Sequence, residues 1–401
     1  MSNDTQPEIR FPGFTEDWEE RKLGDIFVYK QGQQVPVENQ FTKRGKNRHR
    51  FIRIVDLTTN NEAPRYIEYS GDNIISSTDL FMIRYGQPGV IGYGYEGVIA
   101  NNLFKLIPKI ETYNLFFKYI LDSMYPKIQS LSSSTTMPAI SFKSLDVLAV
   151  RYPDKKEQEK IGSFFAQLDN TIALHQRKLD LLKETKKGFL QKMFPKNGAK
   201  VPEIRFPGFT EDWEQRKLGE VSPLRGGFAF KSNKFVKEGI PIVRISNILS
   251  NGSVGGEFVY YTAQEKDENY LLPDKSALLA MSGATTGKVS ILNNPNNNKV
   301  YQNQRVGYFT KTKNVDYSFI STLVRSKIFL DQLNSVLVAG AQPNISSKDI
   351  NVFELTIPKN IEEQKKIGNF FKQLDDTIAL HQRKLDLLKE TKKGFLQKMF
   401  V

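Results

Sequence analysis

The chain has 401 residues, 39% of them hydrophobic, and a formal net charge of +13 with no cysteine. The length predicts two or three domains. The missing cysteine excludes disulfides and thiolate chemistry, and no apolar run is long enough to cross a membrane. The polar start Met1–Thr5 lacks an apolar signal region, so we expect a cytoplasmic protein.

The excess of Lys and Arg favours a polyanionic partner over mere solubility. Nucleic acid is the usual one, because clustered basic side chains displace counterions from phosphates. Charge alone does not separate DNA from RNA or from a membrane surface.

In chain order, the same series of segments occurs twice. Residues 7–24 and 202–219 differ only at Glu20 versus Gln215, and residues 171–194 are identical to residues 377–400. A lead-in, a variable region and a long helix therefore follow one another, and then do so again.

The variable regions, residues 25–150 and 220–355, share only a skeleton of matching positions. We align Lys30-Gln31-Gly32 with Arg225-Gly226-Gly227, Arg53-Ile54-Val55 with Arg244-Ile245-Ser246, Gly86–Gly89 with Gly283–Gly287, and Met137–Ser141 with Gln342–Ser346. Two modules of one fold with different surfaces are predicted.

Each variable region has short runs of β-forming residues bounded by Gly, Asn, Asp and Pro. The clearest predicted strands are Phe51–Val55, Ala277–Met281, Val289–Leu292 and Val306–Thr310, and shorter helices are predicted at Leu115–Ser123 and Ser318–Val336. The fold class is α+β, with two β-rich mixed α/β modules and two long helices. The predicted boundaries are 1–153 and 196–358 for the modules, and 154–195 and 359–401 for the helices.

The long helices carry apolar residues at a spacing of alternately four and three. The first stripe is Ile161, Phe165, Leu168, Ile172, His175, Leu179 and Leu182, and the second is Ile367, Phe371, Leu374, Ile378, His381, Leu385 and Leu388. Asp154 with Glu157, and Asn360 with Glu363, predict capping boxes at the two helix starts.

Identical stripes are self-complementary about a twofold axis, so we expect the helices to pair with each other as an antiparallel coiled coil. The alternative is that each helix pairs with another protein. Leu174, Leu181, Leu380 and Leu387 lie off the stripe. They either widen the shared core, which we favour, or dock partner helices.

Motifs for catalysis are nearly absent. Gly283–Ser290 resembles a phosphate-binding loop, but it has three residues between its glycines and Val289 after the Lys. The three histidines, His49, His175 and His381, form no zinc pattern, and the last two are expected to be core residues. We therefore predict no catalytic site, no metal site and no cofactor in this chain.

Polar residues near predicted turns suit DNA, because Arg pairs with guanine and Asn or Gln with adenine in the major groove. The basic run 43–50 is either a phosphate clamp or a solvated loop. The candidates in the first region are Lys30, Gln31, Gln33, Arg44, Lys46, Arg48, Arg50, Arg84, Gln87 and Tyr93. Those in the second region are Arg225, Gly226, Lys231, Asn247, Thr285, Thr286, Lys288, Gln304, Arg305, Gln342 and Asn344. We expect fewer than half to touch bases. The glycines Gly226, Gly227, Gly283 and Gly287 either approach a phosphate or form hairpin turns.

Order, duplication and motifs together resemble the specificity subunits of type I restriction–modification systems. The resemblance covers essentially the whole chain. It rests on Pro-Gly-Phe-Thr-Glu-Asp-Trp-Glu followed by Arg-Lys-Leu-Gly, and on the segment from Pro343 to Pro358 with Glu363-Gln364, Ile367-Gly368 and Leu374-Asp375, which recurs from Pro138 to Asp169.

The resemblance implies that each module reads one half of a split DNA target and that the helices set the half-site spacing. It also implies two methyltransferase subunits as partners, which carry S-adenosylmethionine, and restriction subunits, which use ATP and Mg. The rival interpretations are a stand-alone repressor-like protein for a split operator, an enzyme with its own nuclease or methyltransferase activity, and a structural coiled-coil adaptor. The first would need no methyltransferase partner, and the last predicts no salt-dependent DNA binding.

Overall fold

The computed structural model describes residues 6–58, 62–133, 136–196, 198–338 and 344–400. By compactness the chain divides into unit 1, residues 1–176 with 383–401, and unit 2, residues 177–382. Each unit thus contains one module and parts of both long helices, whereas the predicted boundaries separate modules from helices. The two units are described separately.

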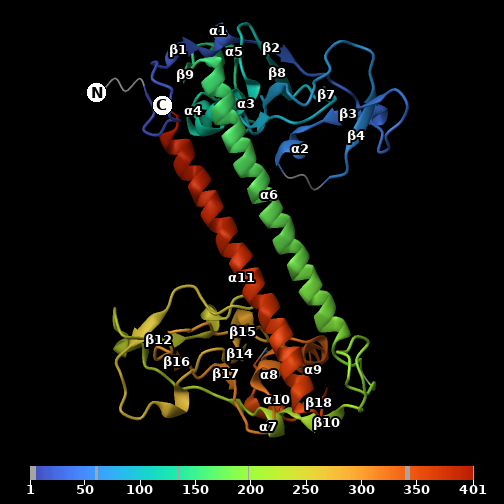
Figure 1. The fold of residues 1–401 in the computed structure, drawn as a ribbon, viewed down its shortest axis with the longest axis vertical. Coiled ribbons are helices and arrows are strands. Elements are labelled where there is room, and N and C mark those ends of the chain that lie inside the picture. The colour runs from blue at the N-terminus through green and yellow to red at the C-terminus, as the bar shows by residue number, and fades with distance from the viewer. Residues whose placement is uncertain (1–5, 59–61, 134–135, 197, 339–343, 401) are drawn as a thin grey trace. The chain divides into compact units, whose positions relative to one another are not determined.

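Apart from the short 3-10 helix η1 (Val37–Asn39), the described part of the first module has nine strands and five short α-helices. They are β1 (Glu19–Lys22), α1 (Leu23–Ile26), β2 (Phe27–Gln31), β3 (Arg48–Ile52), α2 (Ile54–Thr58), β4 (Arg65–Glu68), β5 (Leu80–Ile83), β6 (Ile91–Gly92), β7 (Val98–Ile99), β8 (Leu103–Pro108), α3 (Asn114–Ser123), α4 (Tyr125–Ser130), α5 (Phe142–Asp146) and β9 (Ala149–Tyr152). A four-stranded sheet has the order β2-β8-β5-β6, a three-stranded sheet has the order β4-β3-β7, and β1 pairs with β9. In Figure 1 the three-stranded sheet lies on the far side of the module from β1 and β9.

The second module repeats this arrangement. Over the described residues its elements are β10 (Glu214–Lys217), α7 (Leu218–Val221), β11 (Leu224–Arg225), η2 (Ser232–Lys234), β12 (Ile240–Val243), η3 (Ile245–Asn247), β13 (Val259–Tyr261), η4 (Glu268–Tyr270), β14 (Ala277–Ala280), η5 (Gly283–Thr285), β15 (Val289–Ile291), β16 (Tyr301–Gln302), β17 (Val306–Phe309), α8 (Tyr317–Leu323), α9 (Lys327–Val338), α10 (Ser347–Asn351) and β18 (Glu354–Ile357). The sheets run β11-β17-β14-β15, β13-β12-β16 and β10-β18.

Strand pairing shows that the modules share one topology. Phe51 pairs with Val98 in parallel, as Ile242 pairs with Tyr301. The aligned motifs that begin at Arg53 and Arg244 therefore occupy equivalent positions, and the prediction of two modules with one fold is confirmed.

Most of the predicted short elements are present, but two were wrong in detail. The strand expected over Phe51–Val55 ends at Ile52, because α2 begins at Ile54. The helix expected over Ser318–Val336 is two helices. α8 ends in bonds of the i to i+3 type, such as Arg325 N–H to the Thr322 carbonyl at 3.0 Å, and α9 starts at Lys327. The break lets the Arg325 side chain reach Asp375 at 2.7 Å.

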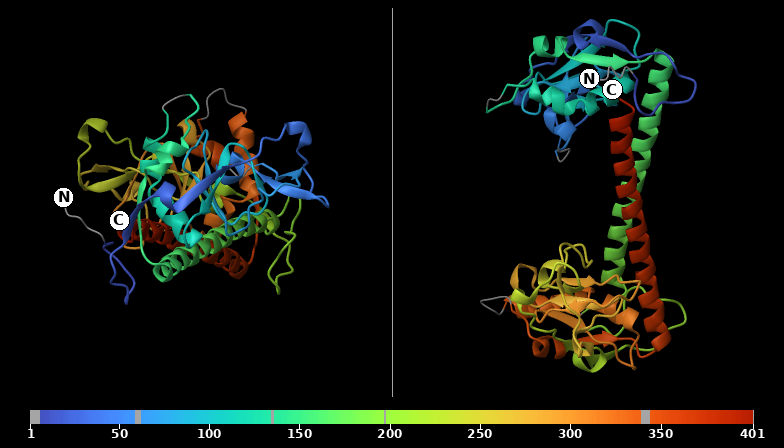
Figure 2. Two further views of the ribbon diagram at one scale, coloured as in Figure 1. Left: turned by 90° about the horizontal axis from the view of Figure 1, so that it is seen from above. Right: turned by 90° about the vertical axis from the view of Figure 1, so that its left-hand side faces the viewer.

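The long helices α6 (Lys155–Lys192) and α11 (Ile361–Lys398) are each unbroken over 38 residues. Figure 2 shows them from two further directions. Each starts with an N-cap bond, from Glu157 N–H to the Asp154 carboxylate at 3.0 Å and from Glu362 N–H to Asn360 Oδ1 at 2.8 Å. The predicted capping boxes were wrong in their second half, because the side chains of Glu157 and Glu363 turn to the lead-ins.

Buried ion pairs fasten each lead-in to its helix. Arg10 donates two hydrogen bonds of 2.7 Å to Glu157, whose side chain is fully buried. Arg205 donates to Glu363 at 2.6 and 2.8 Å in the same way. These bonds hold the pKa of both arginines above the usual value, although burial opposes the effect. In each unit the lead-in arginine and the helix glutamate thus form one ion pair that holds the lead-in against the helix.

The residues after this Glu fix the helix on its own module. Gln158 accepts the Tyr113 N–H at 2.9 Å, and Gln364 accepts the Asp316 N–H at 2.9 Å. A Cβ at Gly162 would lie 3.0 Å from the Phe116 nitrogen, and one at Gly368 would lie 2.6 Å from the Phe319 nitrogen. Only glycine allows this close approach, which gives the Glu-Gln-x-x-x-Gly spacing a physical reason.

Within each unit, α6 and α11 pack against each other in antiparallel order. In unit 1, Phe164 meets Phe395 with centroids 5.2 Å apart, and Lys392 pairs with Asp169 at 2.6 Å. In unit 2, Phe189 meets Phe370 at 5.0 Å, and Lys186 pairs with Asp375. The two helices therefore pair within the chain, as favoured from the sequence.

The helix stripe is buried unevenly. Ile161, Phe165 and Leu179 are buried, as are Ile367, Phe371 and Leu385. His381 is buried as well. The other members of the two stripes are half-buried, namely Leu168, Ile172, His175, Leu182, Leu374, Ile378 and Leu388.

The off-stripe leucines do not widen the core, so that prediction was wrong. Leu174 is 65% exposed, Leu181 and Leu387 are 67% exposed, and Leu380 is 48% exposed.

The residues that directly follow each long helix complete a module core, which the sequence did not predict. Met399 is buried in the core of the first module, where Phe400 stacks on Phe165 at 5.6 Å. Met193 and Phe194 are buried in the core of the second module. Because α6 and α11 are antiparallel, each module is completed by the end of the helix that starts at the other.

Candidate nucleic-acid interface

The basic run of the first module is a loop that leads into β3. Arg44 and Lys46 are exposed. The Arg48 guanidinium lies 3.3 Å from the centroid of the Phe41 ring and 3.4 Å from the Glu68 carboxylate. The loop therefore presents exposed cations beside one that is stacked and paired.

Strand β3 separates a core face from an outer face, because successive side chains point to opposite sides. Phe51, together with Ile67 on β4, is buried. Arg50 pairs across the strands with Tyr66, and Arg48 pairs with Glu68, so these four lie on the other face. The outer face thus places two arginines next to the basic loop.

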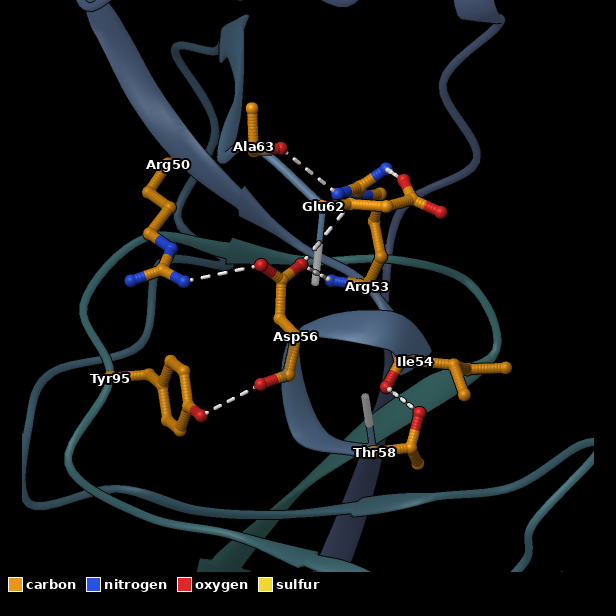
Figure 3. A network of polar contacts seen from close by, with 8 residues as sticks. All are labelled: Arg50, Arg53, Ile54, Asp56, Thr58, Glu62, Ala63 and Tyr95. Carbon is orange, nitrogen blue, oxygen red and sulfur yellow. Dashed lines mark hydrogen bonds and ion pairs between the residues drawn. The ribbon is translucent and has the colours of Figure 1, made fainter. Parts of the chain in front are cut away.

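Asp56 anchors the arginines of this region, as Figure 3 shows. Its carboxylate accepts from Arg50 Nη2 at 3.2 Å and from the Arg53 N–H at 2.8 Å. Tyr95 Oη donates to the Asp56 carbonyl at 3.0 Å, and Arg53 also reaches Glu62 at 2.9 Å. Neither Asp56 nor Arg53 was a sequence candidate. Extending the aligned Arg53-Ile54-Val55 by one residue would have drawn attention to Asp56.

Two sequence candidates of the first module bind each other instead of facing outward. Arg84 donates to Gln31 Oε1 at 2.7 Å, and its guanidinium lies 4.3 Å from the centroid of the Phe142 ring. The Gln31 amide donates to the carbonyls of Asn101 and Leu103. Both side chains therefore stabilise the module, and they are weaker candidates for DNA than their exposed neighbours.

The other candidates of the first module are placed individually. Lys30 is paired with Asp72 at 3.1 Å on the surface, Gln33 is half-buried, and Gln87 is exposed. Tyr93 packs against the core, and burial raises the pKa of its hydroxyl.

In the second module, three candidates are likewise used inside the domain. Asn247 is fully buried, and its amide donates to the Gly255 and Glu257 carbonyls at 3.0 and 2.9 Å. Thr285 Oγ1 donates to the Ile245 carbonyl at 3.0 Å. Arg225 donates to Gln302 Oε1 at 3.0 Å, and burial lowers the pKa of its guanidinium.

Other candidates of the second module are more accessible. Lys231, Gln304, Arg305 and Asn344 are exposed, Gly226 is exposed with open space around its Cα, Thr286 is half-buried, and half-buried Lys288 donates to Ser250 at 2.8 Å. Gln342 lies outside the described residues.

The glycines form turns and close approaches of the chain to itself. Gly283 and Gly287 have φ of +79° and +84° in the connection between β14 and β15, as Gly86 and Gly89 have +85° and +93° between β5 and β6. A Cβ on Gly227 would lie 2.3 Å from the Gln302 carbonyl oxygen. The hairpin-turn interpretation therefore fits Gly283 and Gly287, and Gly227 is needed for a close approach of the chain to itself.

Over the described part of the chain, no group of three or more His, Cys, Asp and Glu side chains could hold a metal ion. Within the same residues, no helix has the length and apolar character needed to cross a membrane.

The fold and its surfaces define a class of protein: a tandem repeat of one α+β module, with near-identical lead-ins and helices but different polar surfaces. The family described as "Type I restriction modification DNA specificity domain" matches residues 15–184 and again 210–390. The chain therefore belongs to this family, as the motifs of the lead-ins and helices predicted.

Individual relatives agree over nearly the full length. The type I restriction enzyme MjaVIII specificity subunit of Methanocaldococcus jannaschii is 25% identical over 396 residues, which cover 95% of this chain and 91% of that protein. The MjaIX specificity subunit of the same organism is 20% identical over 332 residues, or 78% and 74% of the two chains. The crystal structure of a type I restriction–modification S subunit from M. genitalium superposes with a TM-score of 0.71 at 15% identity and covers 99% of both chains, which shows the shared fold.

Proposed function

We propose that this chain is the DNA-sequence-specificity subunit of a type I restriction–modification complex. Each module reads one half of an asymmetric, bipartite double-stranded DNA target. The observation that best supports this function is that one topology occurs twice, with near-identical helices and divergent surfaces. Parts that face two equal partners must match, whereas parts that read two different half-sites must differ.

The proposed partners are two methyltransferase subunits and the restriction subunits. S-adenosylmethionine, ATP and Mg belong to those subunits, and this chain supplies recognition alone. The exposed leucines Leu174 and Leu387 of unit 1, and Leu181 and Leu380 of unit 2, support docking of partner helices, because apolar side chains in water favour burial.

The proposed DNA contacts are exposed polar residues of the two modules together with the partly exposed Arg50. Arg44, Lys46, Arg50 and Gln87 serve the first half-site. Lys231, Gln304, Arg305 and Asn344 serve the second. Phosphate contacts supply most of the affinity, and a smaller set of contacts to base edges supplies the specificity.

The deciding experiment is co-expression of the chain with its methyltransferase in a host that lacks the system, followed by sequencing of methylated adenines. A bipartite motif with a fixed spacer is expected. Methylation without a sequence motif, or specific DNA binding that persists without any methyltransferase partner, would favour the stand-alone repressor instead.

A further inference from the structure

The buried carboxylate of Asp56 has two oxygens with different partners (Figure 3). Asp56 is 3% exposed and lies in α2, just after β3. Oδ2 accepts the backbone N–H of Arg53 at 2.8 Å, which closes the turn between strand and helix, and it also lies 3.5 Å from Arg53 Nε. Oδ1 faces the Arg50 guanidinium at 3.2 Å. The turn needs only the first oxygen, so the second contact requires a separate reason.

The second module shows what the turn needs by itself. Asn247 occupies the equivalent position, and its Oδ1 accepts the Arg244 N–H at 3.0 Å. Its amide nitrogen then donates to backbone carbonyls. The strand register places Pro241, which has no charge, where Arg50 stands in the first module. The acid and the arginine thus occur together in one module and are both missing from the other.

Arg50 is held from two sides while part of it stays accessible. Asp56 contacts one terminal nitrogen, and the Tyr95 ring centroid lies 5.3 Å from the guanidinium carbon. The side chain remains 34% exposed on the outer face of β3. A fixed guanidinium suits a base edge, because bidentate recognition of guanine requires a defined direction, whereas a phosphate accepts many approaches.

We propose that Asp56 is a positioning residue that orients Arg50 to read a guanine in the half-site recognised by the first module. The proposal rests on the proposed function. Asp56 acts through Arg50 and does not itself touch DNA, because its carboxylate is buried and would repel phosphate.

The test replaces Asp56 with Asn, the residue that the second module uses. In Asp56→Asn the amide oxygen keeps the Arg53 N–H bond, and the amide nitrogen then faces Arg50 donor to donor. The probes are duplexes that carry the methylated motif of the wild-type complex, or single substitutions in either half-site. Their Kd values are measured by fluorescence anisotropy at one salt concentration.

Asp56→Asn is expected to weaken binding of the motif about tenfold and to relax the preference at one G·C pair of the first half-site. Preferences in the second half-site stay unchanged. Affinity for unrelated DNA does not fall, because the variant has one negative charge fewer. Glu62→Gln is the matched control: it makes the same charge change and touches Arg53 but not Arg50, so the preferences should remain.

A double-mutant cycle separates positioning from folding. Arg50→Ala should lose the same preference as Asp56→Asn, and the double variant should be no worse than Arg50→Ala. If Asp56→Asn does not fold, Arg50→Ala and Arg50→Lys still test whether that one base pair depends on the guanidinium. Unchanged preferences in Asp56→Asn or Arg50→Ala, or a further loss in the double variant, would overturn the proposal. If the wild-type complex itself shows no motif, the proposed function fails instead.

Discussion

At the scale of residues, similar charged pairs differ in their importance because their burial differs. Arg10 and Glu157 are buried, whereas Arg21 and Glu19 form a pair of 2.6 Å with side chains 39% and 54% exposed. An exposed pair contributes little, but removing one partner of a buried pair leaves an uncompensated charge.

We expect Arg10→Ala to lower the free energy of unfolding by about 3 kcal/mol. Arg21→Ala should change it much less, because its pair with Glu19 is exposed to solvent. Chemical denaturation of the two variants, with hydrogen exchange to locate the loss in unit 1, measures both. Equal effects would show that the Arg10–Glu157 pair does not fasten the lead-in.

Asp375 connects the two helices with the break between α8 and α9 in unit 2. Burial acts to raise its pKa, but Arg325 at 2.7 Å and Lys186 hold the pKa below the usual value. A carboxylate with a lowered folded-state pKa stabilises the protein at neutral pH, and this contribution is lost as the pH falls below the unfolded-state value.

Asp375→Asn should therefore destabilise unit 2 at pH 7, by about 2 kcal/mol for the loss of charged hydrogen bonds. The difference from wild type should stay constant down to about pH 5 and shrink below about pH 4. Urea denaturation at pH 7, 5 and 3.5 follows it. Asp331→Asn, which breaks the exposed pair with Lys327, is the control. A difference that grows toward low pH would contradict the assignment.

At the scale of elements, each helix has leucines of two kinds. Leu179 is 1% exposed on the stripe, whereas Leu181, two residues later, is 67% exposed. Both are in unit 2 and on the same helix, so they differ only in what covers them.

Leu181→Asp together with its copy Leu387→Asp should leave the subunit folded and soluble while abolishing co-purification of the methyltransferase. Leu179→Asp should instead lower solubility, because it buries a charge. Pull-down and circular dichroism on the same preparations separate the two outcomes. Unfolding of the Leu181 and Leu387 variant would restore the core interpretation of these residues.

At the scale of the whole molecule, the proposal assigns half-site sequence to the modules and spacing to the helices. Replacing residues 25–150 with the corresponding region of another family member should change one half-site and leave the other half-site intact. The motif from methylated-adenine sequencing gives the result directly. A change in both half-sites would mean that the modules do not read independently.

Inserting one helical turn of about four residues near Leu179–Leu182, in one or both helices, should change the spacer and leave both half-sites unaltered. The same methylation readout applies. If the bases of the half-sites change while the spacer length does not, the helices would take part in base recognition and would not set the half-site spacing.

Local sequence pattern was enough to predict the duplication, the long helices, most of the named strands and the family. These features depend on periodicity and repeated motifs, which lie within short stretches of chain. The tertiary structure decided which polar residues are available. Gln31 and Arg84 are 53 positions apart, and nothing near either residue indicates that they bind each other. Asp56 lies only six residues from Arg50 and next to an aligned motif, but only the folded chain shows that the two side chains meet.

The amino-acid order by itself thus determined that this protein is two copies of one module on two matching helices. Only the tertiary structure decided that Glu157 binds a lead-in arginine, that the off-stripe leucines are exposed, and that each helix end completes a module core. The physical reason is that helix and strand formation follow from local periodicity, whereas burial and ion pairing depend on which distant segments meet.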